Sequence, residues 1–372
     1  MKKTCAVILA AAVAFASMAG CGKKSEETEA AGTQVLEETM RLKETAGAAE
    51  TTQEAETKEE ETVQPAPAEN AEENAVVIRL GGLKGPTSMG MVKLLDDAEN
   101  GRSKSTVEFT MAVSGDELAP KLLKGDLDVA AVPANLASVL YHNSDGAVQF
   151  VAVNTLGVLS IVETGGEDVQ SVADLKGQTI YATGKGTTPE YALRYLLSEN
   201  GVDPDRDVTI EWMNEPTETV AKMAQAEHAV AMLPQPFVTV AGGQLSNFRI
   251  ALDLTEEWER LENGSRLITA GLVVRKEFAE AHPEALKTFL EEYKASADYL
   301  NENLAEGAAL VEKYDIVKAA VAEKAIPGCN VTYLDGEGMK TAMEGYLQVL
   351  YDANPKAVGG SLPDDGFYLV LP

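Results

Sequence analysis

Residues 116–136 read DELAPKLLKGDLDVAAVPANL, and this stretch predicts three elements in a fixed order. Its acidic start and spaced leucines predict a helix, the apolar run that follows predicts a short buried strand, and Pro133 predicts a loop after that strand. Residues 217–237, TETVAKMAQAEHAVAMLPQPF, show the same order 101 residues later, with Pro234 in the place of Pro133. The recurrence indicates that the chain contains two similar halves.

The correspondence extends outward from this stretch over residues 78–153 and 179–254, without a gap and at the same offset of 101. Within it, KGPTS at 84–88 aligns with KGTTP at 185–189, and each group follows a short apolar strand and precedes a helical pattern. Few residues are identical, and any two strand–helix–strand segments agree to some extent, so the constant offset is the main argument for a repeat. Strands that alternate with helices predict parallel sheets with right-handed crossovers, and ligand loops at the carboxyl ends of the strands.

Two such sheets predict an α/β fold with two lobes and a ligand cleft between them. After the second repeat an apolar strand is followed by strongly helical sequence, which we expect to return to the first lobe. Lobe one is then residues 76–162 plus 267–372, and lobe two is residues 163–266. The two chain crossings, near Glu163 and Arg266, form the expected hinge.

The N-terminal residues 1–20 have the pattern of a lipoprotein signal peptide. Two lysines precede an apolar run, which is too short to span a bilayer and ends in Met18-Ala19-Gly20-Cys21. Small residues before a cysteine resemble the lipobox of bacterial lipoproteins, so we expect cleavage before Cys21 and lipidation of this residue. An ordinary secretory signal is the alternative.

Residues 21–75 predict an acidic, disordered tether. From residue 22 this segment has fifteen glutamates against five lysines and arginines, and it has no aromatic residue. It cannot bury enough apolar surface to offset the entropy lost on ordering, and its like charges repel one another. We therefore expect a solvated spacer between the lipid anchor and the lobes.

Composition and charge exclude several classes of protein. The formal net charge of −28 at pH 7 is unfavourable for nucleic acid, because binding to phosphate needs a basic surface. Cys329 is the one cysteine beyond Cys21, and the three histidines are far apart in the sequence, so we expect neither an intrachain disulfide nor a metal site. We also expect no cofactor, no catalytic residues and a monomer.

Four short motifs carry a resemblance to a known family: GDLDV at 125–129, VADLKG at 172–177, GKGTT at 184–188 and PQPF at 234–237. They resemble the type II periplasmic-binding-protein superfamily, in particular the ABC-importer proteins for aliphatic sulfonates, taurine, nitrate and thiamin-pyrimidine precursors. The resemblance covers about residues 76–372. It implies a two-lobed, lipid-anchored protein outside the cytoplasm that delivers a small molecule to permease and ATPase subunits. In the sulfonate-type proteins the last two motifs look like Gly-Ser-Ser and Trp-Asp-Pro-Tyr, so the identity of the ligand stays open.

The candidate ligand-binding residues lie where predicted strands end or predicted helices begin. Hydroxyl groups and unpaired backbone N–H groups at a helix start can hold an anion or a carbonyl, amides supply both donors and acceptors, and Phe237 can stack on a planar ligand. The alternatives are N-capping for the hydroxyl residues, turn formation for the asparagines and core packing for the phenylalanine. The full set is Pro86, Thr87, Ser88, Asn135, Asn154, Thr155, Gly186, Thr187, Thr188, Gln235 and Phe237.

Two rival functions share the same predicted fold. One is an enzyme of a thiamin or menaquinone type of pathway, and the other is a sensory protein that signals through a membrane receptor. The sequence offers no nucleophile–base pair or histidine pair for an enzyme, and GKGTT at 184–188 lacks the glycine spacing of a nucleotide-binding P-loop. We therefore expect a binding protein whose ATP hydrolysis belongs to a separate subunit.

Overall fold

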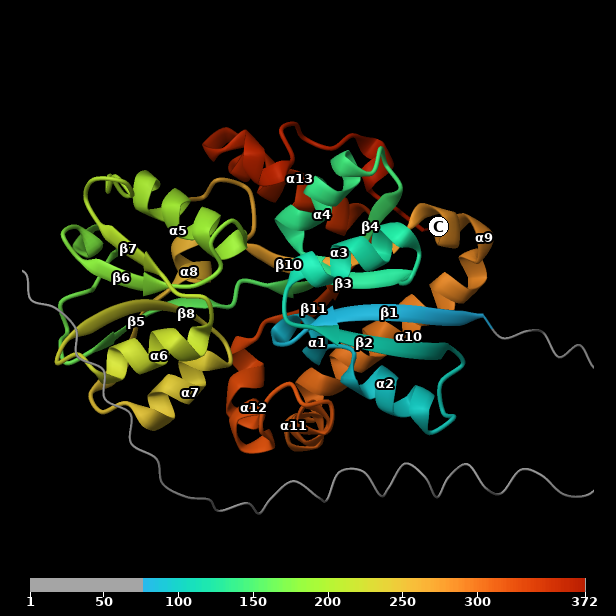
Figure 1. The fold of residues 1–372 in the computed structure, drawn as a ribbon, viewed down its shortest axis with the longest axis horizontal. Helices are drawn as coiled ribbons and strands as arrows, with labels where there is room; N and C mark the ends of the chain where they lie inside the picture. The colour runs from blue at the N-terminus through green and yellow to red at the C-terminus, as the bar shows by residue number, and fades with distance from the viewer. Residues whose placement is uncertain (1–75, 372) are drawn as a thin grey trace, which may run out of the picture. The chain divides into compact units, whose positions relative to one another are not determined.

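The computed structural model describes residues 76–371, and these residues form two β-sheets with helices packed around each of them (Figure 1). The predicted signal peptide, Cys21 and the tether of residues 21–75 lie outside the described residues. No helix in the described part of the chain combines the length and the apolar character needed to cross a membrane.

Six strands form the first sheet: β1 (Val77–Leu83), β2 (Thr106–Ala112), β3 (Val129–Pro133), β4 (Val148–Leu156), β10 (Ile268–Arg275) and β11 (Val331–Leu334). Their order across the sheet is β11-β4-β10-β3-β1-β2. β1 runs parallel to β2 and β3, whereas β10 runs antiparallel to both β3 and β4. β11 pairs with β4 at the edge, also antiparallel.

Five strands form the second sheet: β5 (Leu159–Thr164), β6 (Thr179–Ala182), β7 (Thr209–Trp212), β8 (Ala229–Pro234) and β9 (Phe248–Asp253). Their order is β7-β6-β8-β5-β9. β6 runs parallel to β7 and β8, and β5 runs antiparallel to β8 and β9.

The two sheets share one arrangement, as the offset of 101 residues predicts. β1, β2 and β3 correspond to β6, β7 and β8, and each trio ends beside an antiparallel strand, β10 in the first sheet and β5 in the second. The helices α3 (Gly115–Lys124) and α6 (Pro216–Ala224) begin 101 residues apart. The repeat therefore extends from the sequence pattern to the order of the strands.

The sheets are mixed, whereas the alternation of strands and helices predicted parallel sheets. Two of the antiparallel strands enter their sheets from the other lobe: β5 follows β4 after Gly157 and Val158, and β10 follows the helix α8 (Leu254–Glu259) of lobe two. The parallel rule holds for strands joined by a helix that packs on the same sheet. A strand whose preceding segment belongs to the other sheet can pair in the antiparallel direction.

The chain first passes between the sheets earlier than the sequence predicts. All of β5 pairs with strands of the second sheet, so the predicted crossing near Glu163 falls inside a strand of lobe two. The sheet topology puts this passage at residues 157–158 and the return at residues 260–267, which includes the expected Arg266. Below, lobe two means residues 159–259, and lobe one means the described residues on either side.

The repeated stretch has clear local signals for each element. α3 has Asp116 and Glu117 in its first turn and Lys121 and Lys124 in its last turn, the charge order that favours the helix dipole. It ends at Gly125, whose φ of 82° is a left-handed conformation that glycine adopts without steric cost. The strand β3 then runs through the core, with its first four residues buried.

Helices cover both sheets, and the helices after β10 pack mainly on lobe one. Cys329 is fully buried among them, and burial raises the pKa of its thiol to about 12, so it is a packing residue rather than a reactive one. The remaining helices are α1 (Pro86–Met89), α2 (Val92–Glu99), α4 (Ala134–Asn143), α5 (Thr188–Glu199), α7 (Phe237–Gln244), α9 (Lys276–Ala281), α10 (Pro283–Glu302), α11 (Leu304–Lys313), α12 (Ala319–Ala325) and α13 (Gly336–Ala353).

Candidate functional site

The carboxyl ends of several strands lie where the chain passes between the sheets. β4 ends at Leu156 and β5 begins at Leu159, which pairs with Pro234 at the carboxyl end of β8. In the other sheet Ala270, near the start of β10, pairs with Pro133 at the carboxyl end of β3. The helices α4 and α7, which follow β3 and β8, therefore begin at the edges where the two lobes meet.

One hydrogen-bonded group joins the lobes directly. Thr188, the first residue of α5 in lobe two, donates its hydroxyl to Asn135 Oδ1 of lobe one at 3.4 Å. Tyr346 of α13, also in lobe one, donates its hydroxyl to Thr188 Oγ1 at 3.1 Å. Thr188 and Asn135 are 1% and 4% exposed, and Tyr346 is fully buried, which raises the pKa of its phenol. We call Asn135, Thr188 and Tyr346 the interlobe triad.

The interlobe triad has a fixed orientation. Asn135 Nδ2 donates to the backbone oxygen of Ala357 at 3.2 Å, which leaves Oδ1 directed at α5. The hydroxyl of Thr188 does not cap its own helix, because the N-cap residue is Thr187 and no side-chain cap bond forms there. Simple N-capping therefore does not explain the position of Thr188.

A second polar group lies inside lobe one. Asn154 Nδ2 donates to the backbone oxygen of Thr87 and to the hydroxyl of Tyr293, both at 2.9 Å. Thr155 donates its hydroxyl to Asn154 Oδ1 at 3.0 Å. All four residues are buried, and burial raises the pKa of Tyr293. We call Thr87, Asn154, Thr155 and Tyr293 the lobe-one network.

Pro86 and Ser88 belong to the short helix α1, next to this network. Pro86 occupies the first position of the helix. Ser88 is fully buried, and its hydroxyl has no hydrogen-bond partner among the described residues. A Cβ atom at Gly82 would lie 2.3 Å from Ser88 Oγ, so this close approach of helix and strand requires glycine.

The hydrogen-bonding groups at the start of α5 are occupied by neighbouring residues of the same segment. The backbone N–H of Gly186, a predicted ligand donor, donates to Glu190 Oε2 at 2.7 Å. Thr187 donates its hydroxyl to the backbone oxygen of Gly184 at 2.7 Å. Gly186 and Thr187 thus have partners within their own turn, and of the three predicted residues here it is Thr188 that reaches lobe one.

Gln235 and Phe237 follow β8 in lobe two. Gln235 Oε1 accepts hydrogen bonds from the backbone N–H of Thr239 at 3.3 Å and from its hydroxyl at 2.9 Å. The amide nitrogen of Gln235 faces lobe one, because a Cβ atom on Gly328 would lie 3.0 Å from it. Phe237 is half-buried and packs against the core of lobe two, in line with the core-packing alternative.

Sequence reasoning missed Tyr293, Tyr346 and Asn330. Both tyrosines lie on the buried faces of long helices, where their spacing is that of any core aromatic residue. Asn330 forms hydrogen bonds with the segment where the chain passes between the sheets. Its backbone oxygen accepts a hydrogen bond from the N–H of Leu156 at 3.1 Å, and its side-chain amide donates one to the backbone oxygen of Gly157. Its φ of 44° is a left-handed conformation that asparagine adopts more readily than most residues, and this is the one local signal for it.

Neutral side chains make up both the interlobe triad and the lobe-one network. The two lysines that precede the aligned helix starts lie at the surface. Lys84 forms an ion pair with Asp315 at 3.2 Å, and Lys185 is exposed. The two groups therefore offer hydroxyl, phenol and amide groups for hydrogen bonding, without a cationic side chain among them.

A cavity of about 680 Å³ lies between α5 and α13, with walls from both lobes. Arg194 lines it and forms ion pairs with Glu190 at 3.0 Å and Asp205 at 2.8 Å. The cavity does not include any of the eleven predicted ligand residues.

A family model described as the periplasmic substrate-binding protein of phosphonate ABC transporters matches residues 97–325, more than half of the chain. None of the curated proteins matches the chain. Among solved structures, an ABC transporter protein from Parabacteroides distasonis is 24% identical, with a TM-score of 0.66 over 79% of this chain and 98% of that one.

Two further solved structures have the same fold. The periplasmic aliphatic sulphonate binding protein SsuA from Escherichia coli is 18% identical, with a TM-score of 0.63 over 76% of this chain and 95% of that one. The periplasmic nitrate-binding protein NrtA from Synechocystis is 15% identical, with a TM-score of 0.50 over 71% and 74%. These likenesses support the two-lobed α/β architecture.

Proposed function

Because the chain belongs to the family of periplasmic substrate-binding proteins of phosphonate ABC transporters, we propose that it holds its small-molecule ligand between its lobes, at the interlobe triad. Membership of this family implies a location outside the cytoplasm and a permease as partner. The observation that carries the proposal is a buried contact between lobes, in which Thr188 is shared by Asn135 and Tyr346.

The mechanism that we propose is closure of the lobes on the ligand. A ligand that takes the place of the contacts within the interlobe triad gains a hydroxyl from lobe two and an amide and a phenol from lobe one. It then binds the closed arrangement better than a separated one, because the two sets of donors meet only on closure. The permease is presented with the closed form, and ATP hydrolysis belongs to a separate subunit.

For the ligand we propose a polar organic molecule that is neutral or carries a single negative charge. A fully ionised phosphonate carries two charges, and burying these without a cationic partner is costly. The interlobe triad is neutral, Lys84 is paired with Asp315, and Glu190 already accepts from the N–H at the start of α5. The residues that we assign to the site therefore favour recognition by neutral hydrogen bonds.

For the N-terminal residues we propose a lipid anchor on Cys21 and a tether over residues 21–75, and for the lobes a monomer without catalytic activity. Replacement of Cys21→Ser tests the anchor, since the variant should move from the membrane fraction to the soluble fraction. A variant that still pellets with membranes in a detergent-sensitive way would show another mode of attachment.

Native mass spectrometry of the full chain, purified without denaturation, tests the ligand proposal. We expect a co-purified small molecule, recovered unchanged after long incubation. Titration calorimetry with methylphosphonate, ethanesulfonate and a neutral aminopyrimidine then compares charge classes, and we expect methylphosphonate to bind most weakly. Tight methylphosphonate binding that weakens strongly with salt would contradict the neutral site, and conversion of the molecule in proportion to protein and time would indicate an enzyme.

A further inference from the structure

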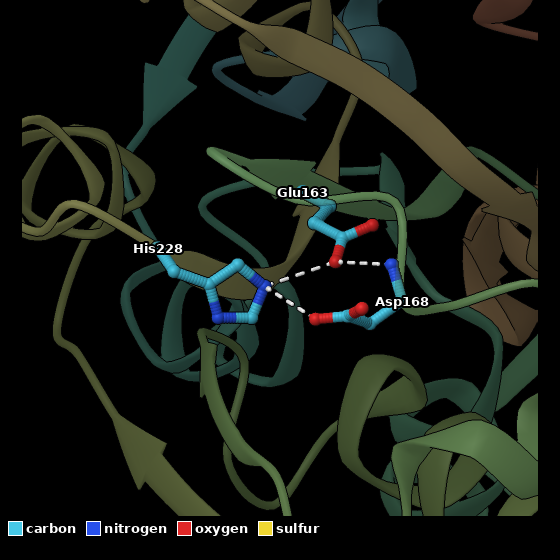
Figure 2. A group of neighbouring side chains, drawn as sticks. All are labelled: Glu163, Asp168 and His228. Carbon is cyan, nitrogen blue, oxygen red and sulfur yellow. Dashed lines mark hydrogen bonds and ion pairs between the residues drawn. The ribbon is translucent and has the colours of Figure 1, made fainter.

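The far end of lobe two brings His228 next to two carboxylates, although the separation of the histidines in the sequence predicts no metal site. Glu163 lies in β5, His228 directly precedes β8, and Asp168 lies in the loop after β5 (Figure 2). Thr164 at the end of β5 pairs with Ala229 at the start of β8. This is the end of the sheet opposite to the chain passage, so the group is separate from the interlobe triad.

Three atoms that commonly ligate metals converge at this end. His228 Nε2 lies 2.9 Å from Glu163 Oε1 and 3.8 Å from Asp168 Oδ2. All three atoms lie within 4.8 Å of one another. Figure 2 shows both carboxylates directed at the same ring nitrogen. Three separate chain segments thus bring one imidazole nitrogen and two carboxylate oxygens to one point.

Glu163 is held in this orientation from its other side. Its side chain is fully buried, Oε2 accepts a hydrogen bond from Arg249 Nε at 2.9 Å, and Oε1 accepts one from the backbone N–H of Asp168 at 3.0 Å. Burial by itself would raise the pKa of Glu163, but the hydrogen bonds from His228, Asp168 and Arg249 outweigh it, and the pKa is lowered. These contacts hold Glu163 with Oε1 facing His228.

Asp168 is the residue that a simple ion pair leaves unexplained. The distance of 3.8 Å between Asp168 Oδ2 and His228 Nε2 is too long for a hydrogen bond, so Nε2 can donate a hydrogen bond to Glu163 but not to Asp168. Water screens part of the repulsion between the two carboxylates, because Asp168 is exposed, and a cation between them would remove the rest. Arg249 binds the opposite oxygen of Glu163. One divalent ion bound by all three atoms would satisfy both carboxylates and the imidazole.

We propose that Glu163, Asp168 and His228 form a binding site for a divalent transition metal ion, with zinc as the best match. Zinc takes imidazole nitrogen and carboxylate oxygen in proteins, whereas magnesium and calcium prefer sites made of oxygen alone. Arg249 has the position of an outer partner that orients a metal ligand. The side chains of His228 and Asp168 are 35% and 73% exposed, which gives an ion and its water ligands access.

Zinc binding to the full chain, freed of metal with a chelator, tests the proposal. In calorimetric titration with zinc chloride we expect one saturable site per chain, weakened about tenfold or more in Asp168→Asn and in His228→Gln. Glu167→Gln removes a neighbouring carboxylate and His142→Gln a distant imidazole, and both variants should bind as the unaltered chain does. Because Asp168 is exposed, its variant should keep the fold, and thermal melts without zinc check this.

X-ray absorption of the zinc-loaded chain should show a shell of nitrogen and oxygen ligands with no sulfur, and the outer-shell pattern of one imidazole ring. The proposal is wrong if no saturable binding occurs, or if Asp168→Asn binds zinc as tightly as the unaltered chain. The contact between His228 and Glu163 would then be a hydrogen bond within the fold and no part of a metal site. An equal loss of affinity in Glu167→Gln would indicate unspecific binding to surface charge and would overturn the site as well.

Discussion

Thr87 and Thr188 occupy the same place in the two halves of the chain, 101 residues apart, yet they contribute through different atoms. Thr87 contributes its backbone oxygen, which accepts a hydrogen bond from Asn154 within lobe one. Thr188 contributes its side chain, which bonds to Asn135 and Tyr346 of the other lobe. The same local sequence pattern therefore has an internal role in one lobe and an interlobe role in the other.

The difference comes from the part of the chain that has no counterpart in lobe two. α1 is four residues long and packs on strands of the first sheet, where Tyr293 of α10 completes its network. α5 is twelve residues long and contacts α13, which supplies Tyr346. The comparison teaches that the C-terminal helices, rather than the repeat itself, decide what each threonine does.

Asn154→Ala should have the largest effect on stability, because it removes the centre of the lobe-one network. It leaves the Tyr293 hydroxyl and the Thr87 oxygen buried without this donor, at about 1–3 kcal/mol each, so we expect a loss of about 2–6 kcal/mol in the free energy of unfolding. Urea unfolding measures it. Asn143→Ala at the exposed end of α4 is the matched control and should change stability by less than about 0.5 kcal/mol. Similar effects of the two variants would mean that the network contributes nothing.

Thr188→Val should have an intermediate effect, and it separates the two aligned threonines. The change keeps the shape of the side chain and removes the hydroxyl shared by Asn135 and Tyr346, so we expect stability to fall by about 1–2 kcal/mol and binding of the co-purified ligand to weaken by about 0.5–1.5 kcal/mol.

Thr87→Val is the matched control for this change, because it leaves the backbone oxygen in place. We expect its effect on stability to be below about 0.5 kcal/mol. Thermal melts with and without the ligand measure both variants. Equal losses of stability in the two variants would show that the two threonine hydroxyls do not differ in their contribution. Unchanged ligand binding in Thr188→Val would show that the interlobe triad does not bind the ligand.

Glu190→Gln should have the smallest effect. The Glu190 carboxylate accepts from the Gly186 N–H and pairs with Arg194 near the helix start, an arrangement worth about 0.3–1 kcal/mol. We expect a stability loss of that size and no gain in methylphosphonate binding. A clear gain in affinity for methylphosphonate would mean that the start of α5 is an anion site that Glu190 blocks, and recognition would then not depend on neutral groups alone.

Local chemistry predicted the repeat because its signals are short-ranged. The acidic start of α3, its end at Gly125 and the buried run of β3 each specify one element. The acidic start and the buried run return 101 residues later, whereas Ala226 stands in the place of Gly125. The first passage between lobes could not be placed in this way. β4 and β5 are both almost fully buried, so apolar residues continue on both sides of residues 157–158, and no change of period marks the point where the sheet changes.

The contacts made by the candidate site residues could be foreseen only in part, for the same reason. Strand ends and helix starts pointed to Thr188 and Asn135, which do meet. They pointed equally to Gly186 and Thr187, which bond within their own turn. The choice between a cap, a turn and an interlobe contact depends on which surface packs against each helix start. The predictions for Cys21 and the tether rest on residues outside the described part of the chain.

The sequence alone determined the repeat, the two-lobed α/β class and the loops that can carry a site, because periodicity, helix caps and glycine conformations act over a few residues. The tertiary structure alone decided the partners. Tyr346 lies 158 residues from Thr188, and His228 lies 65 residues from Glu163. Hydrogen bonds and metal–ligand bonds act over about 2–3 Å and depend on direction, so groups this far apart in the chain meet only once the whole fold has placed them.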